Sequence, residues 1–117
     1  MFKSGHVSVM VADLKQAVRF YVETLGLKLT HQVEGHLAVV EVPGLTISFI
    51  YPAGGQSSEQ GKAQNMSIGL EVQDLDSAVE TLKSRGVQFQ HIKEEKATRL
   101  AQFSDPEGNP FYLIELK

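Results

Sequence analysis

The sequence contains one motif twice. The segments HVSVMVADLKQAV (residues 6–18) and SIGLEVQDLDSAV (residues 67–79) share the pattern V-x-D-L-x-x-A-V in the same register. A repeat of this kind indicates two copies of one supersecondary unit, each packed against a neighbour. At 117 residues, the chain is long enough to hold both copies in one compact domain with its own core.

Each copy predicts a strand followed by a helix. Alternating apolar residues precede Asp13 and Asp74, and an aspartate at this point can cap a helix by accepting from the free N–H groups of its first turn. Apolar side chains then recur at helical spacing up to Gly26 and Gly86, which can adopt the left-handed conformation that ends a helix. Three strand-like runs follow each glycine. The predicted class is α+β, with two βαβββ modules in tandem.

A polar segment separates the two copies. AGGQSSEQGKAQN (residues 53–65) is rich in glycine and has no apolar period, which is typical of an exposed connector. The sequence therefore predicts a first module at 1–52, a linker at 53–65 and a second module at 66–117. Composition leaves open whether the segment is a plain linker, which we favour, or a lid over a site.

Charge and cysteine content exclude several kinds of protein. Eleven basic and fourteen acidic residues give a net charge of −3, which argues against a surface that neutralises nucleic-acid phosphates. The absence of cysteine excludes disulfides, thiolate metal sites and cysteine nucleophiles. The sequence has neither a signal-peptide pattern nor an apolar run long enough to span a bilayer. We expect a cytoplasmic protein that binds neither nucleic acid nor membrane.

Alternation along the strand-like runs separates two faces of the predicted sheets. One face is uniformly apolar and suits packing beneath the helices. The other mixes small, polar and apolar residues, which favours the lining of a ligand cavity. The alternative is that this face meets water, as one face of many antiparallel sheets does. We favour the cavity, because Met10, Ile50 and Ile114 would otherwise all be exposed.

Two longer motifs resemble those of a known superfamily. HVSVMVADLKQAVRFYVETLGLKL (residues 6–29) and FSDPEGNPFYL (residues 103–113) resemble segments of the vicinal oxygen chelate superfamily, which includes glyoxalase I, extradiol dioxygenases and bleomycin-resistance proteins. The resemblance implies a curled eight-stranded sheet cup with the helices outside. It also implies a divalent metal, held by one residue from the first and last strand of each module. The matching positions here are His6, Ser48, Ser67 and Tyr112.

The residues at these four positions are poor metal ligands. A divalent ion needs about three or four anionic or imidazole donors to replace its water shell. Only His6 is such a donor, because Ser48 and Ser67 carry neutral hydroxyls. Tyr112, with a reference pKa of about 10, is protonated at neutral pH. We therefore expect no metal and no other cofactor, with a divalent metal as the less favoured alternative.

Other polar residues are weaker candidates for a functional site. His31 and His91 continue the alternation of the apolar residues before them, which predicts packed or interfacial histidines. Glu71 lies on the mixed face. Arg99 is either a partner for a ligand carboxylate or phosphate, or a solvated residue at a strand end. The candidate ligand-binding residues are His6, Ser48, Ser67, Glu71, Arg99 and Tyr112.

Two functions fit this pattern. We favour a small-molecule binding protein of the glyoxalase and bleomycin-resistance type, in which the candidates supply a few oriented hydrogen bonds. The alternative is a lyase or isomerase acting on a small carbonyl compound, either metal-dependent or based on His6. In that case His6 moves a proton and Tyr112 donates to a developing oxyanion. The binding function is favoured because the sequence shows neither a carboxylate to orient His6 nor a nucleophile.

The expected partners are a small-molecule ligand and a second copy of the chain. The resemblance implies a two-fold dimer. Unpaired strands at the sheet edges also favour a dimer, because an exposed edge strand can pair with another chain.

Overall fold

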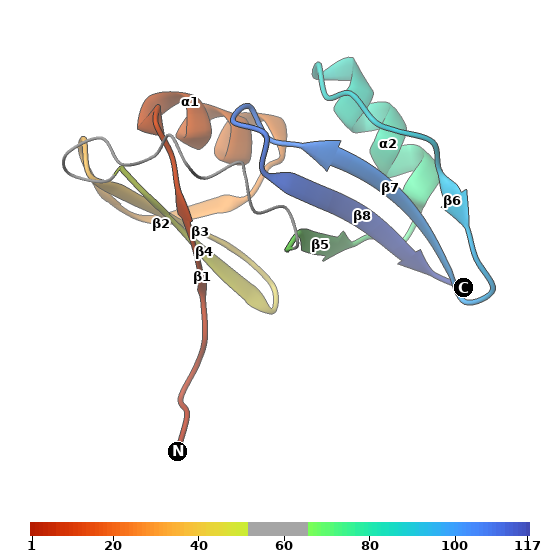
Figure 1. Ribbon diagram of the computed structural model, residues 1–117, viewed down its shortest axis with the longest axis horizontal. Helices are drawn as coiled ribbons and strands as arrows, with labels where there is room; N and C mark the ends of the chain where they lie inside the picture. Colours follow the sequence, from red (N-terminus) through yellow and green to blue (C-terminus); the bar gives the residue numbers. More distant parts are fainter. Residues whose placement is uncertain (52–65) are drawn as a thin grey trace. The chain divides into compact units, whose positions relative to one another are not determined.

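A computed structural model describes residues 1–51 and 66–117 (Figure 1). The chain divides into two compact units, unit 1 (Met1–Lys62) and unit 2 (Ala63–Lys117). The segment 53–65, predicted to be a linker or a lid, lies outside the described residues.

Unit 1 is one four-stranded sheet with a helix after its first strand. Its elements are β1 (Val7–Met10), α1 (Leu14–Val18), the π-helix η1 (Arg19–Thr24), β2 (Lys28–Val33), β3 (Leu37–Val42) and β4 (Leu45–Ile50). The strand order is β1-β4-β3-β2, with β1 parallel to β4 and the other pairs antiparallel.

Unit 2 repeats this topology. Its elements are β5 (Ile68–Glu71), α2 (Leu75–Ser84), β6 (Lys93–Glu94), β7 (Thr98–Ser104) and β8 (Pro110–Leu116). The strand order is β5-β8-β7-β6, and again only the first and last strands of the unit pair in parallel. The predicted fold class, α+β with two βαβββ modules in tandem, is confirmed. Among the described residues, the strands of the expected cup lie in two separate four-stranded sheets.

Both helices begin where the aspartates predicted. Asp13 Oδ1 accepts from the Gln16 N–H at 3.0 Å, and Asp74 Oδ1 accepts from the Ser77 N–H at 3.1 Å. A side-chain cap of this kind is worth about 1 kcal/mol to a helix. The predicted stop after the second helix is also present, since Gly86 has a φ of 97°.

The first helix differs from the expected regular α-helix. After α1 the chain widens into η1, where the Leu25 N–H bonds the Phe20 carbonyl, five residues back. Tyr21 is fully buried in this stretch, and its ring stacks on that of Phe49 in β4 with centroids 4.1 Å apart.

The core of each unit lies between its helix and one face of its sheet. Figure 1 shows α2 on one side of β7 and β8, and α1 contacts β3 and β4. The fully or almost fully buried strand residues are Ala38, Val40, Ile47, Phe49, Ala101, Phe103, Phe111 and Leu113. Ile47, Phe49, Phe111 and Leu113 among them belong to the apolar faces that alternation predicted.

The turn before β8 is held by a buried carboxylate. Asp105 Oδ1 accepts from the N–H groups of Glu107 (2.9 Å) and Asn109 (2.8 Å), and its Oδ2 accepts from Asn109 Nδ2 (2.8 Å). Gly108 has a φ of 86°, which suits glycine. This turn fixes where β8 starts, and so fixes which of its side chains face the helix.

Among the described residues, neither α1 nor α2 has the length and apolar content that a membrane-crossing helix requires.

Candidate functional site

We call the side of each sheet that faces away from the helix its open face. In unit 1, Ser48 lies on this face, directly between Ser8 of β1 and Val39 of β3. Ser48 and Val39 are half-buried and Ser8 is exposed. His6 comes one residue before β1 and is exposed. Strand alternation assigns it to the same side as Ser8.

The open face of unit 2 is centred on Tyr112. This residue pairs with Gly69 of β5 on one side and Gln102 of β7 on the other. Glu71 lies one row along β5, opposite Ile114, and is exposed. Ser67 directly precedes β5 and is also exposed.

The Tyr112 ring lies over the backbone of Gly69. A Cβ atom placed on Gly69 would come within 2.3 Å of Tyr112 Cζ and 2.5 Å of its hydroxyl oxygen. Real Cβ atoms do not approach other atoms this closely, so only glycine leaves the ring in this position. A glycine inside a strand commonly marks such a close approach.

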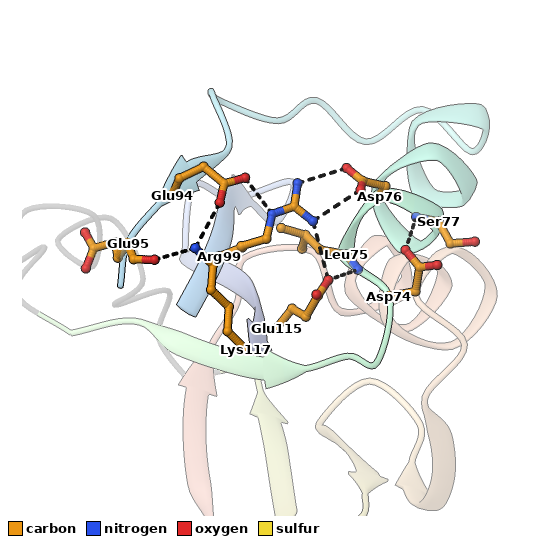
Figure 2. A network of polar contacts seen from close by, with 9 residues as sticks. All are labelled: Asp74, Leu75, Asp76, Ser77, Glu94, Glu95, Arg99, Glu115 and Lys117. Carbon is orange, nitrogen blue, oxygen red and sulfur yellow. Dashed lines mark hydrogen bonds and ion pairs between the residues drawn. The ribbon is translucent and has the colours of Figure 1, made fainter. Parts of the chain in front are cut away.

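Arg99 lies apart from the other candidates. It alternates with the buried Ala101 and Phe103, and so belongs to the helix-covered side of β7. Its Nε donates to Glu94 at 2.6 Å, and its two terminal nitrogens donate to the two carboxylate oxygens of Asp76, each at 3.2 Å (Figure 2). The guanidinium is thus engaged by carboxylates of its own unit.

The contacts around Arg99 of β7 tie this strand to three further elements of unit 2. Glu115 of β8 lies 3.6 Å from Arg99 Nη1 and accepts from the first N–H of α2, that of Leu75, at 2.7 Å. Lys117 lies 3.3 Å from Glu94 and donates to the Glu95 carbonyl at 2.6 Å. Figure 2 shows α2, β6 and the end of β8 meeting at this network.

The network also shifts the ionisation of its members. Hydrogen bonds from Arg99 lower the pKa of the Asp76 carboxyl and that of Glu94 below their ordinary values. The two carboxylates in turn raise the pKa of Arg99. All three groups therefore remain charged at neutral pH.

The structure places His31 differently from the prediction. His31 was expected to be a packed or an interfacial histidine. It is not packed within its unit, because the residue is exposed and pairs with Val39 on the open face of unit 1. One extra residue in β2 shifts the alternation between Leu29 and His31. His91, likewise expected to pack or lie at an interface, is exposed.

Sequence reasoning also missed two neighbours of Tyr112. Gln102 flanks it on the open face, and Gly69 lies beneath its ring. Gly69 could have been recognised from the sequence, because glycine is unfavourable within a strand and suggests a close contact. The alternation of β7 could have placed Gln102 on this side, opposite Ala101 and Phe103.

The four positions that the resemblance assigns to a metal carry mostly weak metal donors. His6 and Ser48 lie in unit 1, and Ser67 and Tyr112 lie in unit 2. Three of the four side chains are a neutral hydroxyl or phenol, which are weak donors for a divalent ion. Within the two described stretches, there is no group of three or more His, Cys, Asp or Glu side chains arranged to hold a metal.

Unit 1 also has a hollow of about 560 Å³ at the hairpin between β3 and β4. Among the residues that line it are Ser4, Lys28, Glu41, Pro43 and Thr46. Lys28, Glu41 and Thr46 pair with one another across β2, β3 and β4. The hollow thus adjoins a polar row of the sheet.

Comparison with known proteins places this fold in a family. A sequence profile of the Glyoxalase/Bleomycin resistance protein/Dioxygenase superfamily matches residues 3–113. Uncharacterized protein YetH of Bacillus subtilis is 34% identical over 119 residues, covering 95% of this chain and 96% of YetH.

Solved structures of other proteins share this fold. TnmS3, an antibiotic binding protein from Streptomyces sp. CB03234, has a TM-score of 0.80 at 26% identity, covering 100% of this chain and 98% of TnmS3. A superfamily member from Sphaerobacter thermophilus has a TM-score of 0.77 at 28% identity, with 98% of each chain covered. The chain belongs to the Glyoxalase/Bleomycin resistance protein/Dioxygenase superfamily.

Proposed function

We propose that this protein binds a small organic molecule on the open faces of its sheets. The observation that carries the proposal is the composition of these faces. Small, polar and apolar side chains alternate there across hydrogen-bonded strands, as in the rows Ser8–Ser48–Val39 and Gly69–Tyr112–Gln102. Ligand pockets combine an apolar lining with a few placed polar groups in this way.

The similarity to TnmS3 supports the same function. That protein binds an antibiotic and shares the fold over the full length of this chain. We infer that this chain, too, takes a compact organic ligand. His6, Ser48, Ser67, Glu71 and Tyr112 are the proposed hydrogen-bonding groups. Arg99 is proposed to stabilise unit 2, because its guanidinium is occupied by Asp76 and Glu94.

We further propose that binding requires no metal. The donor chemistry supports this, since His6 is the only strong ligand among the four positions that the superfamily would use. Binding then depends on hydrogen bonds and on apolar contact with residues such as Met10, which is 45% exposed. A lyase or isomerase based on His6 and Tyr112 is the alternative, and it predicts turnover that His6→Ala abolishes.

Thermal shift with metal-free protein tests the proposal. A ligand at about 100 times its Kd stabilises the folded state by about 2.7 kcal/mol, which raises the Tm of a domain of this size by about 10 °C. A panel of small aromatic and antibiotic compounds is screened against wild type, Ser48→Ala and Tyr112→Phe, with His91→Ala as a control outside the sheets. At least one compound should stabilise wild type and the control, and should stabilise one of the two site variants less.

A panel that shifts no Tm, or shifts only that appear when Zn²⁺ or Fe²⁺ is added, would overturn the metal-free binding function. Turnover of a carbonyl substrate that is lost in His6→Ala would favour the enzyme instead.

We also propose that the protein acts as a cytoplasmic homodimer. The outermost strands of its open sheets include β2 and β6, which can pair or pack with a second copy. Light scattering coupled to size exclusion should give twice the mass of the chain, and the mass of one chain would contradict the dimer.

A further inference from the structure

A β-bulge turns His31 toward the open face of unit 1. Thr30 is the extra residue between the pairs Leu29↔Val40 and His31↔Val39, and its hydroxyl donates to the Val39 carbonyl at 3.3 Å. Without the bulge, His31 would share the side of Leu29, which pairs with the buried Val40. Bulges beside binding sites often serve to re-aim a side chain.

The bulge brings His31 into one cross-strand row with candidate residues. Across β2, β3, β4 and β1, this row reads His31, Val39, Ser48 and Ser8. His31 and Ser48 lie on strands two apart, which separates them by about 10 Å. Val39, half-buried, forms an apolar floor between the two polar side chains.

The rows on either side differ in chemistry. One is apolar throughout and consists of Met10, Ile50, Leu37 and Val33. Its outer members are the most open, with Met10 45% and Val33 40% exposed. The other row is polar and consists of Thr46, Glu41 and Lys28, beside the 560 Å³ hollow. The face is therefore graded from apolar to charged.

We propose that this face binds a flat amphipathic acid about 10 Å long, the separation of two strand spacings. The His31 imidazole donates to the acidic group, a carboxylate or phenolate, and the Ser48 hydroxyl bonds a hydroxyl or carbonyl at the other end. The apolar body lies over Val39 and toward Leu37 and Ile50. The inference rests on the proposed small-molecule function and names its ligand class.

The charged residues near His31 contribute little to the preference for an acid. Lys28 lies on the same strand and the same side, and Glu41, its cross-strand partner, offsets part of its charge. The hydrogen bond from His31 is therefore expected to supply most of the preference for an acid. A hydrogen bond to a charged group contributes enough to change an affinity about tenfold.

The test uses 6-hydroxy-2-naphthoate as the probe and its methyl ester as the matched neutral compound. Both are titrated by fluorescence and by ¹H–¹⁵N correlation spectra into wild type, His31→Ala, His31→Gln and His91→Ala. Wild type and His91→Ala should bind the acid about tenfold more tightly than the ester. His31→Ala should bind the two equally, and His31→Gln, whose amide can donate, should retain part of the preference. Spectra of the free variants verify that each is folded.

The possible failures are distinguishable. If His31→Ala keeps the tenfold preference, or if the acid perturbs only residues away from this row, His31 has no role in recognition. If the probe pair fails to bind while other panel compounds do, the ligand class is wrong and the proposed function stands. If no compound binds at all, the proposed function itself fails.

Discussion

The two units hold different side chains at the same place in the same fold. Ser8 pairs with Ser48 between β1 and β4 of unit 1, and Gly69 pairs with Tyr112 between β5 and β8 of unit 2. In unit 1 this position presents two small hydroxyl groups. In unit 2 a phenol ring lies across a glycine. The backbone pairing is repeated, so the difference in chemistry between the two open faces comes from a few substitutions on one scaffold.

The helix-covered faces differ in charge. Asp76, in the first turn of α2, engages Arg99, whereas the corresponding position of α1 is Lys15. An acidic residue is favourable at a helix N-terminus and a basic one is not. Unit 2 thus has an ion-pair network on its helix-covered side. On the corresponding side of unit 1, Tyr21 stacks on Phe49.

The largest expected effect comes from the aromatic cores. Phe49 of unit 1 and Phe111 of unit 2 are 0% and 1% exposed, so each substitution by alanine should cost about 3–5 kcal/mol of unfolding free energy. Urea denaturation measures both. A loss below about 1 kcal/mol for either one would show that its unit does not depend on the core described above.

The next largest effect is expected on stability in acid, because the ion pairs of Arg99 with Asp76 and Glu94 lie in unit 2. Because the pKa values of Asp76 and Glu94 are lowered in the folded state, their contribution is full above their ordinary values of 3.8 and 4.5. It is lost as the pH falls through the lowered folded-state values. Wild type should therefore lose more stability than Arg99→Gln between neutral pH and about pH 2.5.

The matched control is Arg19→Gln, an exposed arginine of unit 1, which should follow wild type. Urea midpoints measured along the pH range supply the comparison, and added salt should narrow the gap. Identical acid profiles for wild type and Arg99→Gln would remove the network from the account of stability.

A smaller effect on stability is expected at Gly69. Alanine there cannot coexist with the Tyr112 ring in its present position, so the ring must move. The net change in unfolding free energy should stay below about 1 kcal/mol, because alanine suits a strand better than glycine and offsets lost ring packing. Ser8→Ala, at the equivalent position of unit 1, is the control.

Nuclear Overhauser contacts between the Tyr112 ring and the residue 69 backbone should be present in wild type and absent in Gly69→Ala. Their persistence in the variant would show that the glycine does not position the ring.

The smallest change in Tm is expected when a metal ion is removed or added. Because His6 is the only strong donor among the four superfamily positions, treatment with a chelator should leave the Tm within about 1 °C, and added Zn²⁺ should not raise it in proportion to a single site. A stoichiometric ion that survives dialysis, measured by elemental analysis, would contradict this expectation.

Much of the fold could be read from the sequence because its signals are local. The Asp13 and Asp74 caps act within one helical turn, and alternation in β4 and β8 correctly separated Phe49 from Ser48 and Leu113 from Tyr112. Each of these depends on neighbours a few residues away.

The features that sequence missed depend on distant partners or on a single inserted residue. Alternation fails beyond Thr30, because one bulged residue reverses the side of every later residue in β2, including His31. The sequence left Arg99 as either a ligand partner or a solvated residue at a strand end, because its partners Asp76 and Glu115 come together only in the folded unit. The π-helical turn of η1 and the ring over Gly69 likewise reflect packing rather than a local pattern.

The most direct test of the central claim is a ¹H–¹⁵N correlation spectrum of metal-free protein during titration with a compound that raises its Tm. Saturable shifts should concentrate on the open faces, at residues such as Ser8, Val39 and Ser48 in unit 1 or Gly69 and Tyr112 in unit 2. Shifts confined to the helix-covered sides, or shifts that require an added metal ion, would contradict the central claim.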